Sequence, residues 1–188
     1  MANRKALVLL AKGAEEMETV ITVDVLRRGK IPTTVASLDE DASRPVSCSR
    51  DVKVMADCSL KEAMAKGPYD AIVLPGGLKG AQNLAAAPAI KEILKKQEER
   101  GEIIAAICAA PIALKAHEIC KGRKVTSYPS FKDQLVGYYD YCEDRVVVDG
   151  TLVTSRGPGT CFEFALKLVE LLVDPNTAKK IHEGLLVN

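Results

Sequence analysis

The fold is decided by the stretch Ile103-Ile-Ala-Ala-Ile-Cys-Ala-Ala-Pro111. Its first five residues are uncharged and apolar, which is typical of a strand that a parallel sheet buries on both faces. Pro111 suits the first turn of a helix. Cys108 is therefore expected in a tight turn between a buried strand and a helix, which is the geometry of a nucleophile elbow. The alternative is a small buried thiol that only packs.

Short apolar runs of the same kind alternate with helix-like segments elsewhere in the chain. The expected strands are residues 5–11, 31–37, 71–74 and 103–107. The expected helices are residues 15–28 and 89–100, each followed by a glycine that suits a helix C-cap. This alternation predicts an α/β fold in which right-handed crossovers place helices on both faces of a mostly parallel sheet.

Several segments depart from the alternation. Residues 52–56 predict a short strand, and residues 146–153 predict a hairpin that turns at an Asp-Gly pair. Residues 59–62 and 160–163 have the pattern of a capping box, and the second should open a helix to about residue 173. A short helix is expected to close the chain, with residues 185–187 docking back onto the domain.

Length and composition are those of one globular domain. The chain has 188 residues, of which 47% are hydrophobic, so we expect a single domain over residues 1–188. Its 26 basic and 25 acidic residues give a net charge of +1, which does not support nucleic-acid binding. The apolar stretch 103–114 is shorter than the roughly 18 residues of a membrane span, and none is predicted.

The six cysteines lack the spacings of a metal site. No two of them form a C-x-x-C pair, and two histidines do not suggest a histidine-rich metal site. Glycine motifs for phosphates or dinucleotides are missing too, so neither a metal nor a cofactor is predicted. A chain of this length needs no disulfides, and we interpret the cysteines as reduced thiols of a cytoplasmic protein.

Ligands of open α/β sheets bind beyond the carboxyl ends of the strands. The segments that follow the strands and the hairpin should therefore converge; they are residues 13–18, 75–77, 108–111 and 156–160. Gly76 and Gly77 either present amides to an oxyanion or form a plain turn. Backbone amides near Cys108 are expected to lower the pKa of its thiol.

Three glutamates, Glu15, Glu16 and Glu18, stand at the start of the first expected helix. Acidic residues at this place usually serve the helix dipole. One of them could instead turn inward, where burial would raise its pKa and let it donate a hydrogen bond to a Cys108 thiolate. The spacing does not choose among the three.

Five segments, taken in order, resemble one known family. They are Ala11-Lys-Gly-Ala-Glu-Glu-Met-Glu18, Cys48-Ser-Arg-Asp51, Val73-Leu-Pro-Gly-Gly77, Ala105-Ala-Ile-Cys-Ala109 and Thr154-Ser-Arg-Gly-Pro-Gly-Thr160. From Leu7 to the C-terminal helix the chain is similar to the DJ-one/PfpI superfamily, in its parkinsonism-associated deglycase branch. The resemblance implies a flavodoxin-like sandwich, a homodimer, and a location in the cytoplasm, nucleus and mitochondria.

The resemblance also implies roles for individual residues. Cys108 matches the nucleophile and oxidation-sensitive thiol, and Glu18 matches the carboxyl that hydrogen-bonds to it. Gly76, Gly77 and Ala109 match amides on the oxyanion side. The residues that match positions near the dimer interface are Arg28, Arg50 and Met17.

Two departures from the family pattern bear on activity. Peptidases of the superfamily have His directly after the nucleophile; here that residue is Ala109, so neither peptidase nor amidotransferase activity is expected. The family often has His, a proposed catalytic partner, at the position of Tyr128, which leaves Tyr128 as an accessory candidate.

The resemblance implies a cofactor-independent glyoxalase or protein deglycase that acts on methylglyoxal, glyoxal and early glycation adducts. The alternative is a non-catalytic redox sensor and chaperone, in which Cys108 oxidises to sulfinate and protein partners change with the redox state. Met17, Val20, Ile21 and Asp24 lie near one face of the first expected helix, and this stripe predicts a homodimer unless the sheet covers it.

Overall fold

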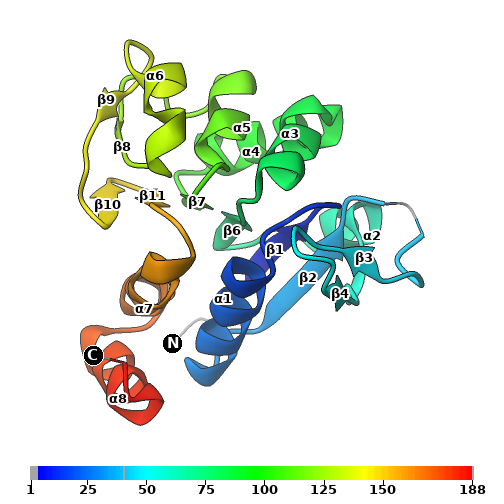
Figure 1. Cartoon of the computed structure of the whole chain (residues 1–188). Helices are drawn as coiled ribbons and strands as arrows, with labels where there is room; N and C mark the ends of the chain where they lie inside the picture. The colour runs from blue at the N-terminus through cyan, green and yellow to red at the C-terminus, as the bar shows by residue number, and fades with distance from the viewer. Residues whose placement is uncertain (1–3, 40, 188) are drawn as a thin grey trace.

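The computed structural model describes residues 4–39 and 41–187, which form a central sheet between two groups of helices (Figure 1). The strands of the sheet are, in spatial order, β10 (Val146–Asp149), β11 (Leu152–Ser155), β7 (Ile103–Ile107), β6 (Ala71–Leu74), β1 (Ala6–Leu10), β2 (Thr33–Ser37) and β5 (Cys58–Ser59). Neighbouring strands are parallel except in the β10–β11 hairpin. The prediction of a mostly parallel α/β sandwich is confirmed.

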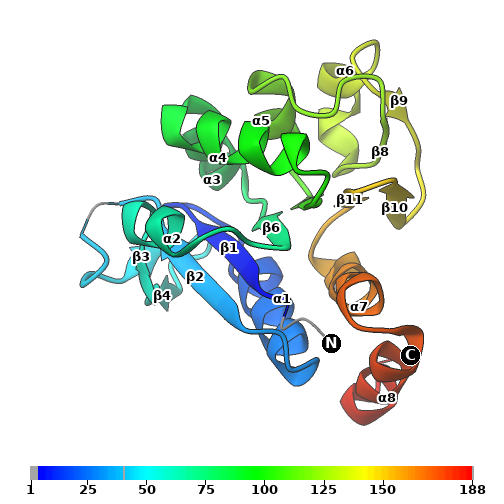
Figure 2. The ribbon, with the colours of Figure 1, turned by 180° about the vertical axis from the view of Figure 1, so that it is seen from behind.

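Helices cover both faces because successive side chains of each strand point to opposite sides. In β1, Ala6 and Val8 pack toward α1 (Glu16–Arg28) and α7 (Cys161–Leu172), and α8 (Pro175–Leu185) packs on α7. Leu7 and Leu9 belong to the core of the other face. Figure 2 shows the helices of that face, which are α2 (Leu60–Lys66), α3 (Leu78–Ala86), α4 (Pro88–Glu99) and α5 (Pro111–Ala116).

The remaining elements are short. The strands β3 (Val46–Ser47) and β4 (Lys53–Val54) form an antiparallel pair, and β8 (Lys124–Val125) pairs in parallel with β9 (Asp140–Tyr141). The only other helical segments of the described chain are η1 (Pro129–Phe131), α6 (Lys132–Leu135) and η2 (Pro158–Thr160). No helix of residues 4–39 and 41–187 is both long and apolar enough to cross a membrane.

Continuous apolar runs and glycine caps located the main elements well. The expected strands 71–74 and 103–107 coincide with β6 and β7, and the expected hairpin is β10–β11. Gly29 caps α1, and Gly101 follows α4 in a left-handed conformation with φ of 64°. The capping box at Ser59 and Glu62 is present at the start of α2.

One local prediction was wrong, and another was confirmed only in part. Thr160 begins α7 without a capping box, because its hydroxyl is bound to Ser155 (2.7 Å) and to loop amides. Glu163 pairs instead with Arg145 (2.7 Å). At the C-terminus Leu185 is partly buried against α7, but Leu186 is in the left-handed region and exposed, so this side chain does not dock back.

Candidate active site

The carboxyl ends of four strands meet where the topology of the sheet reverses. From β1 the chain passes to β2 on one side and later to β6 on the other, which makes the β1–β6 border the switch point of the sheet. Glu15 N donates to Gly76 O (3.0 Å), which joins the loop after β1 to the loop after β6. Cys108 N donates to Ser155 O (3.0 Å), which joins the ends of β7 and β11.

Cys108 stands in a strained turn directly after β7. Its φ is 63°, a left-handed conformation that a residue with a side chain rarely adopts. Two backbone hydrogen bonds hold it there: its amide donates to Ser155 O, and Tyr128 N donates to its carbonyl oxygen (3.0 Å). The residue is only 9% exposed, so little of it is accessible to solvent.

The three glutamates of the first turn of α1 have three different surroundings. Glu15 is the N-cap and accepts from Glu18 N (2.8 Å). Glu16 accepts from Ser49 Oγ and from Arg50 N, both at 2.7 Å. Burial raises the pKa of Glu16, but these hydrogen bonds outweigh it and leave the pKa below its ordinary value. Only Glu18 turns toward Cys108.

Glu18 is fully buried and carries an unusual carboxyl. Its Oε2 accepts from Gly76 N (2.7 Å), while Oε1 has no hydrogen-bond partner of standard geometry among the described residues. Burial raises the pKa of Glu18 from 4.5 to about 7, because the charged form loses its hydration. The Gly76 amide lowers the pKa, the charge of Glu15 raises it, and the Cys108 thiol lowers it. The expected inward carboxyl is therefore present.

Gly76 lies close to both the Glu18 carboxyl and the Cys108 side chain. A Cβ at this position would lie 2.6 Å from Cys108 Cβ and 2.7 Å from Glu18 Oε2, closer than any side chain could be. Glycine is thus required for the approach of Glu18 to Cys108. The Gly76 amide donates to Glu18 in this structure, whereas the Gly77 and Ala109 amides face the Cys108 sulfur, so an oxyanion role of Gly76 stays a prediction.

Burial and the nearby backbone amides shift the pKa of the Cys108 thiol in opposite directions. Burial raises the pKa of the thiol to about 12, and the negative charge of an ionised Glu18 contributes to this rise. The amides of Gly77 and Ala109 face the sulfur and lower the pKa, as expected, but by less than burial raises it. When Glu18 holds the proton its charge no longer opposes a thiolate. The two groups therefore titrate as a pair that shares one proton.

The two arginines implied by the resemblance make hydrogen bonds to other groups than Cys108. Arg28 pairs with Asp24 (2.8 Å), and Arg50 donates to Ser49 O (3.1 Å). Arg28 lies ten residues beyond Glu18 on α1, which is about 15 Å along the helix axis. Tyr128, in contrast, is next to the site, since its amide bonds to Cys108.

Sequence reasoning missed the residues that hold the elbow from behind. Ser155 O anchors the Cys108 amide, and Thr160 Oγ1 fixes the following turn by accepting from Arg156 N (3.2 Å) and Gly157 N (3.1 Å). The sequence predicted that residues 156–160 converge with residues 108–111, but local spacing does not show which backbone and hydroxyl groups form these hydrogen bonds. Within residues 4–39 and 41–187 no cluster of three or more His, Cys, Asp or Glu side chains is placed to hold a metal ion.

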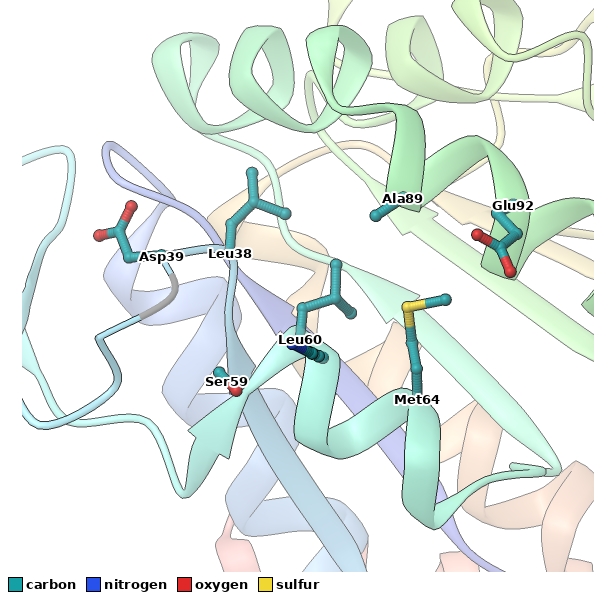
Figure 3. Close-up of a pocket in the computed structure, with 8 residues that line it drawn as sticks. Leu38, Asp39, Ser59, Leu60, Met64, Ala89 and Glu92 are labelled. Atoms are coloured by element: carbon teal, nitrogen blue, oxygen red, sulfur yellow. The ribbon is translucent and has the colours of Figure 1, made fainter.

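A cavity of about 580 Å³ lies away from this site, between α2, α4 and the end of β2 (Figure 3). Its apolar lining residues are Leu38, Leu60, Met64 and Ala89. Two of its polar groups are already engaged, since Glu92 pairs with Lys96 (2.7 Å) and Ser59 takes part in the capping box of α2. Because no cysteine or histidine lines this cavity, we place the candidate active site at Cys108.

Comparisons with known proteins identify the family of this chain. The model of the DJ-1/PfpI family matches residues 4–171. The "Parkinson disease protein 7 homolog" of Danio rerio is 54% identical over 189 residues, which cover all of this chain and 99% of the relative. The "Glutathione-independent glyoxalase DJR-1.2" of Caenorhabditis elegans is 41% identical, with 96% of this chain and 95% of the relative covered.

Solved structures show the same fold over nearly the whole chain. Drosophila melanogaster DJ-1beta has a TM-score of 0.95 at 48% identity and covers 99% of both chains. Oxidized Toxoplasma gondii DJ-1 has a TM-score of 0.91 at 40% identity and covers 97% of this chain and 98% of its own. By sequence and by structure, this chain belongs to the DJ-1/PfpI family.

Proposed function

We propose that this chain is a cofactor-independent glyoxalase that converts methylglyoxal to lactate and glyoxal to glycolate. The observation that carries the proposal is the fully buried Glu18 carboxyl beside the Cys108 thiol, with a pKa of about 7. A carboxyl with this pKa exchanges protons readily near neutral pH, as general acid–base catalysis requires. The name of the Caenorhabditis elegans relative supports the assignment.

The first step joins sulfur to the aldehyde carbon. As Cys108 Sγ forms the bond, its proton passes to the Glu18 carboxylate and the carbonyl electron pair moves to the aldehyde oxygen. That oxygen takes the proton from Glu18, which completes a hemithioacetal. The Gly77 and Ala109 amides, which face the sulfur, stabilise the negative charge that develops before attack.

The second step moves hydrogen within the substrate. The Glu18 carboxylate removes the proton from the former aldehyde carbon, and the keto oxygen takes up a proton, which gives an enediol. Glu18 then returns its proton to the former keto carbon while the hydroxyl on the first carbon loses its own proton, so that in total this hydroxyl proton replaces the one taken up by the keto oxygen. The first carbon is thereby oxidised to a thioester while the second is reduced to an alcohol. Water hydrolyses the thioester, releases lactate and restores the thiol. Methylglyoxal plus water gives lactate, so no external oxidant or reductant is needed.

Deglycation of proteins belongs to the same proposal as a slower branch. Hemithioacetal and hemiaminal adducts of Cys, Lys and Arg side chains contain the same dicarbonyl carbon skeleton. Cys108 is only 9% exposed, so an adduct attached to a protein surface reaches the sulfur less easily than a free aldehyde does. We therefore expect free methylglyoxal to be consumed faster than glycated side chains.

We propose further that the active protein is a homodimer through α1. Met17 and Val20 are both about half exposed, although α1 buries Thr22, Val25 and Leu26 on its other face. Apolar side chains on an otherwise packed helix indicate a covered surface. Since Arg28 lies far from Cys108 in its own chain, any role of this arginine at the site requires a second copy.

Formation of lactate from methylglyoxal without glutathione tests the enzymatic proposal. Wild type should form lactate, and Cys108→Ser and Glu18→Gln should lose at least a hundredfold in kcat/KM. Cys142→Ser is the matched control, because this partly exposed thiol lies outside the site and should leave the rate unchanged. Lactate formation by Cys108→Ser at the wild-type rate would contradict the proposal.

A second candidate function, oxidation sensing, is favoured by the oxidized state of the Toxoplasma gondii relative. A Cys108 thiolate formed by proton transfer to Glu18 would react with peroxide, and the protonated carboxyl could then hold one sulfinate oxygen. Peptide mass spectrometry after one equivalent of peroxide should find oxygen on Cys108 before Cys48, Cys58 or Cys161. Earlier oxidation of one of those three thiols would argue against a sensing role for Cys108.

A further inference from the structure

Two exposed apolar side chains adjoin the groups that hold Cys108. Tyr128 is 46% exposed, and its own amide donates to Cys108 O (3.0 Å). Leu78 is 53% exposed and begins α3 directly after Gly77, whose amide faces the Cys108 sulfur. A substrate that approaches a reactive atom can contact large apolar side chains that lie exposed beside it.

The ring of Tyr128 is held in place on the side of the loop after β11. A Cβ on Gly157 would lie 3.3 Å from Cδ2 of the tyrosine, so the glycine leaves room for the ring to pack on the backbone. Phe131 supports the ring from another side, with centroids 6.5 Å apart and planes tilted by 58°. These contacts with Gly157 and Phe131 restrict the position of the Tyr128 ring.

The charged side chain of Arg156, beside Gly157, is bound to another loop. Arg156 precedes Gly157 in the chain, but its guanidinium donates to Glu143 O (2.6 Å). The exposed surfaces of Leu78 and Tyr128, next to the groups that hold Cys108, are therefore mainly hydrocarbon. Such surfaces favour apolar groups, because contact removes both partners from water.

We propose that Tyr128 and Leu78 determine substrate specificity by favouring 2-oxoaldehydes with a bulky apolar, above all aromatic, group on the keto carbon. The inference rests on the proposed glyoxalase function and adds the substrate class. Glyoxal has only hydrogen at this carbon and gains nothing from the two side chains. If the two side chains cover about half of the surface of a phenyl group, kcat/KM for phenylglyoxal should rise on the order of tenfold relative to glyoxal.

The test compares initial rates for phenylglyoxal, methylglyoxal and glyoxal without glutathione, measured as mandelate, lactate and glycolate. The quantity of interest is the ratio of kcat/KM for phenylglyoxal to that for glyoxal. Dividing the ratio of each variant by that of wild type cancels the intrinsic reactivity of the aldehydes. Variants are Tyr128→Ala, Tyr128→Phe and Leu78→Asn. Val136→Ala is the control, since this half-exposed valine at the end of α6 is also an apolar surface side chain.

The expected result is a roughly tenfold lower ratio in Tyr128→Ala and a smaller decrease in Leu78→Asn, carried by KM and not by kcat. Tyr128→Phe should keep the wild-type ratio, because it keeps the ring, and Val136→Ala should leave it unchanged. An unchanged ratio in an active Tyr128→Ala protein overturns the inference alone, as does an equal loss for all three aldehydes. A wild type that turns over none of them overturns the proposed function as well.

Discussion

Replacement of Glu18 by Gln should make the stability of the protein less dependent on pH. The folded state raises the pKa of Glu18 from 4.5 to about 7, so it favours the protonated carboxyl. An acid whose pKa is raised by folding contributes its full stability below pH 4.5 and loses it as the pH rises through about 7. Gln keeps an oxygen that can accept from Gly76 N but has no proton to lose.

The size of the effect follows from the two pKa values. A difference of one in pKa corresponds to about 1.4 kcal/mol, so complete ionisation of Glu18 costs the folded state about 3 kcal/mol. Part of this cost is already present at pH 5 and nearly all of it at pH 8. Between these two pH values wild type should therefore lose about 2 to 3 kcal/mol relative to Glu18→Gln.

Urea unfolding followed by circular dichroism at pH 5, 6, 7 and 8 measures this difference. One protein concentration is used throughout, because the proposed dimerisation would also contribute to stability. Glu16→Gln is the matched control on the same turn of α1. Folding lowers the pKa of Glu16, so its contribution changes only below pH 4.5 and its difference curve should be flat from pH 5 to 8. A wild-type minus Glu18→Gln difference that stays constant within about 0.5 kcal/mol would show that Glu18 titrates normally, and would refute the reasoning.

Three further predictions concern activity and assembly. The kcat/KM for methylglyoxal should rise with pH through about 7, because the pair of Glu18 and Cys108 must lose one proton, and a profile without this inflection would contradict the proposed base. Gly76→Ala should abolish turnover and lower the free energy of unfolding by about 1 to 3 kcal/mol, since its methyl group would overlap Cys108 Cβ. Lactate assays and thermal melting measure the two effects, and an active variant of normal stability would contradict the geometry. Light scattering should give about twice the chain mass of 20.2 kDa, and Met17→Glu should shift the protein toward the monomer; a wild type near 20.2 kDa would exclude the dimer.

The sequence predicted the elements that depend on local pattern. Strands β6 and β7 were located to the residue, because uninterrupted apolar runs such as 103–107 are required wherever both faces of a sheet are covered. The position of Cys108 after a buried strand and before Pro111 likewise follows from adjacent residues. These features need no knowledge of what the rest of the chain does.

Features that depend on distant partners could not be predicted. Thr160 and Glu163 have the capping-box pattern, yet Ser155 and Arg145 bind their side chains instead. The glycine pair of segment 75–77 indicated free amides, but the direction of the Gly76 amide is set by Glu18, which is far away in the sequence. The raised pKa values of Glu18 and Cys108 could not be predicted either. Burial is the largest cause of both, and local spacing does not show how deeply a side chain will lie.

The site is held in an unfavourable arrangement by the scaffold around it. The left-handed conformation of Cys108 costs about 1 to 2 kcal/mol, and ionisation of buried Glu18 costs about 3 kcal/mol more. Domains of this size are stable by only about 5 to 15 kcal/mol, so these costs are a substantial fraction of the total. The backbone bonds from Cys108 to Ser155 and from Tyr128 to Cys108 oppose relaxation of the elbow. Glu18→Gln at pH 8 should be more stable than wild type and inactive, because the ionised carboxyl that weakens the fold is the group that accepts the thiol proton.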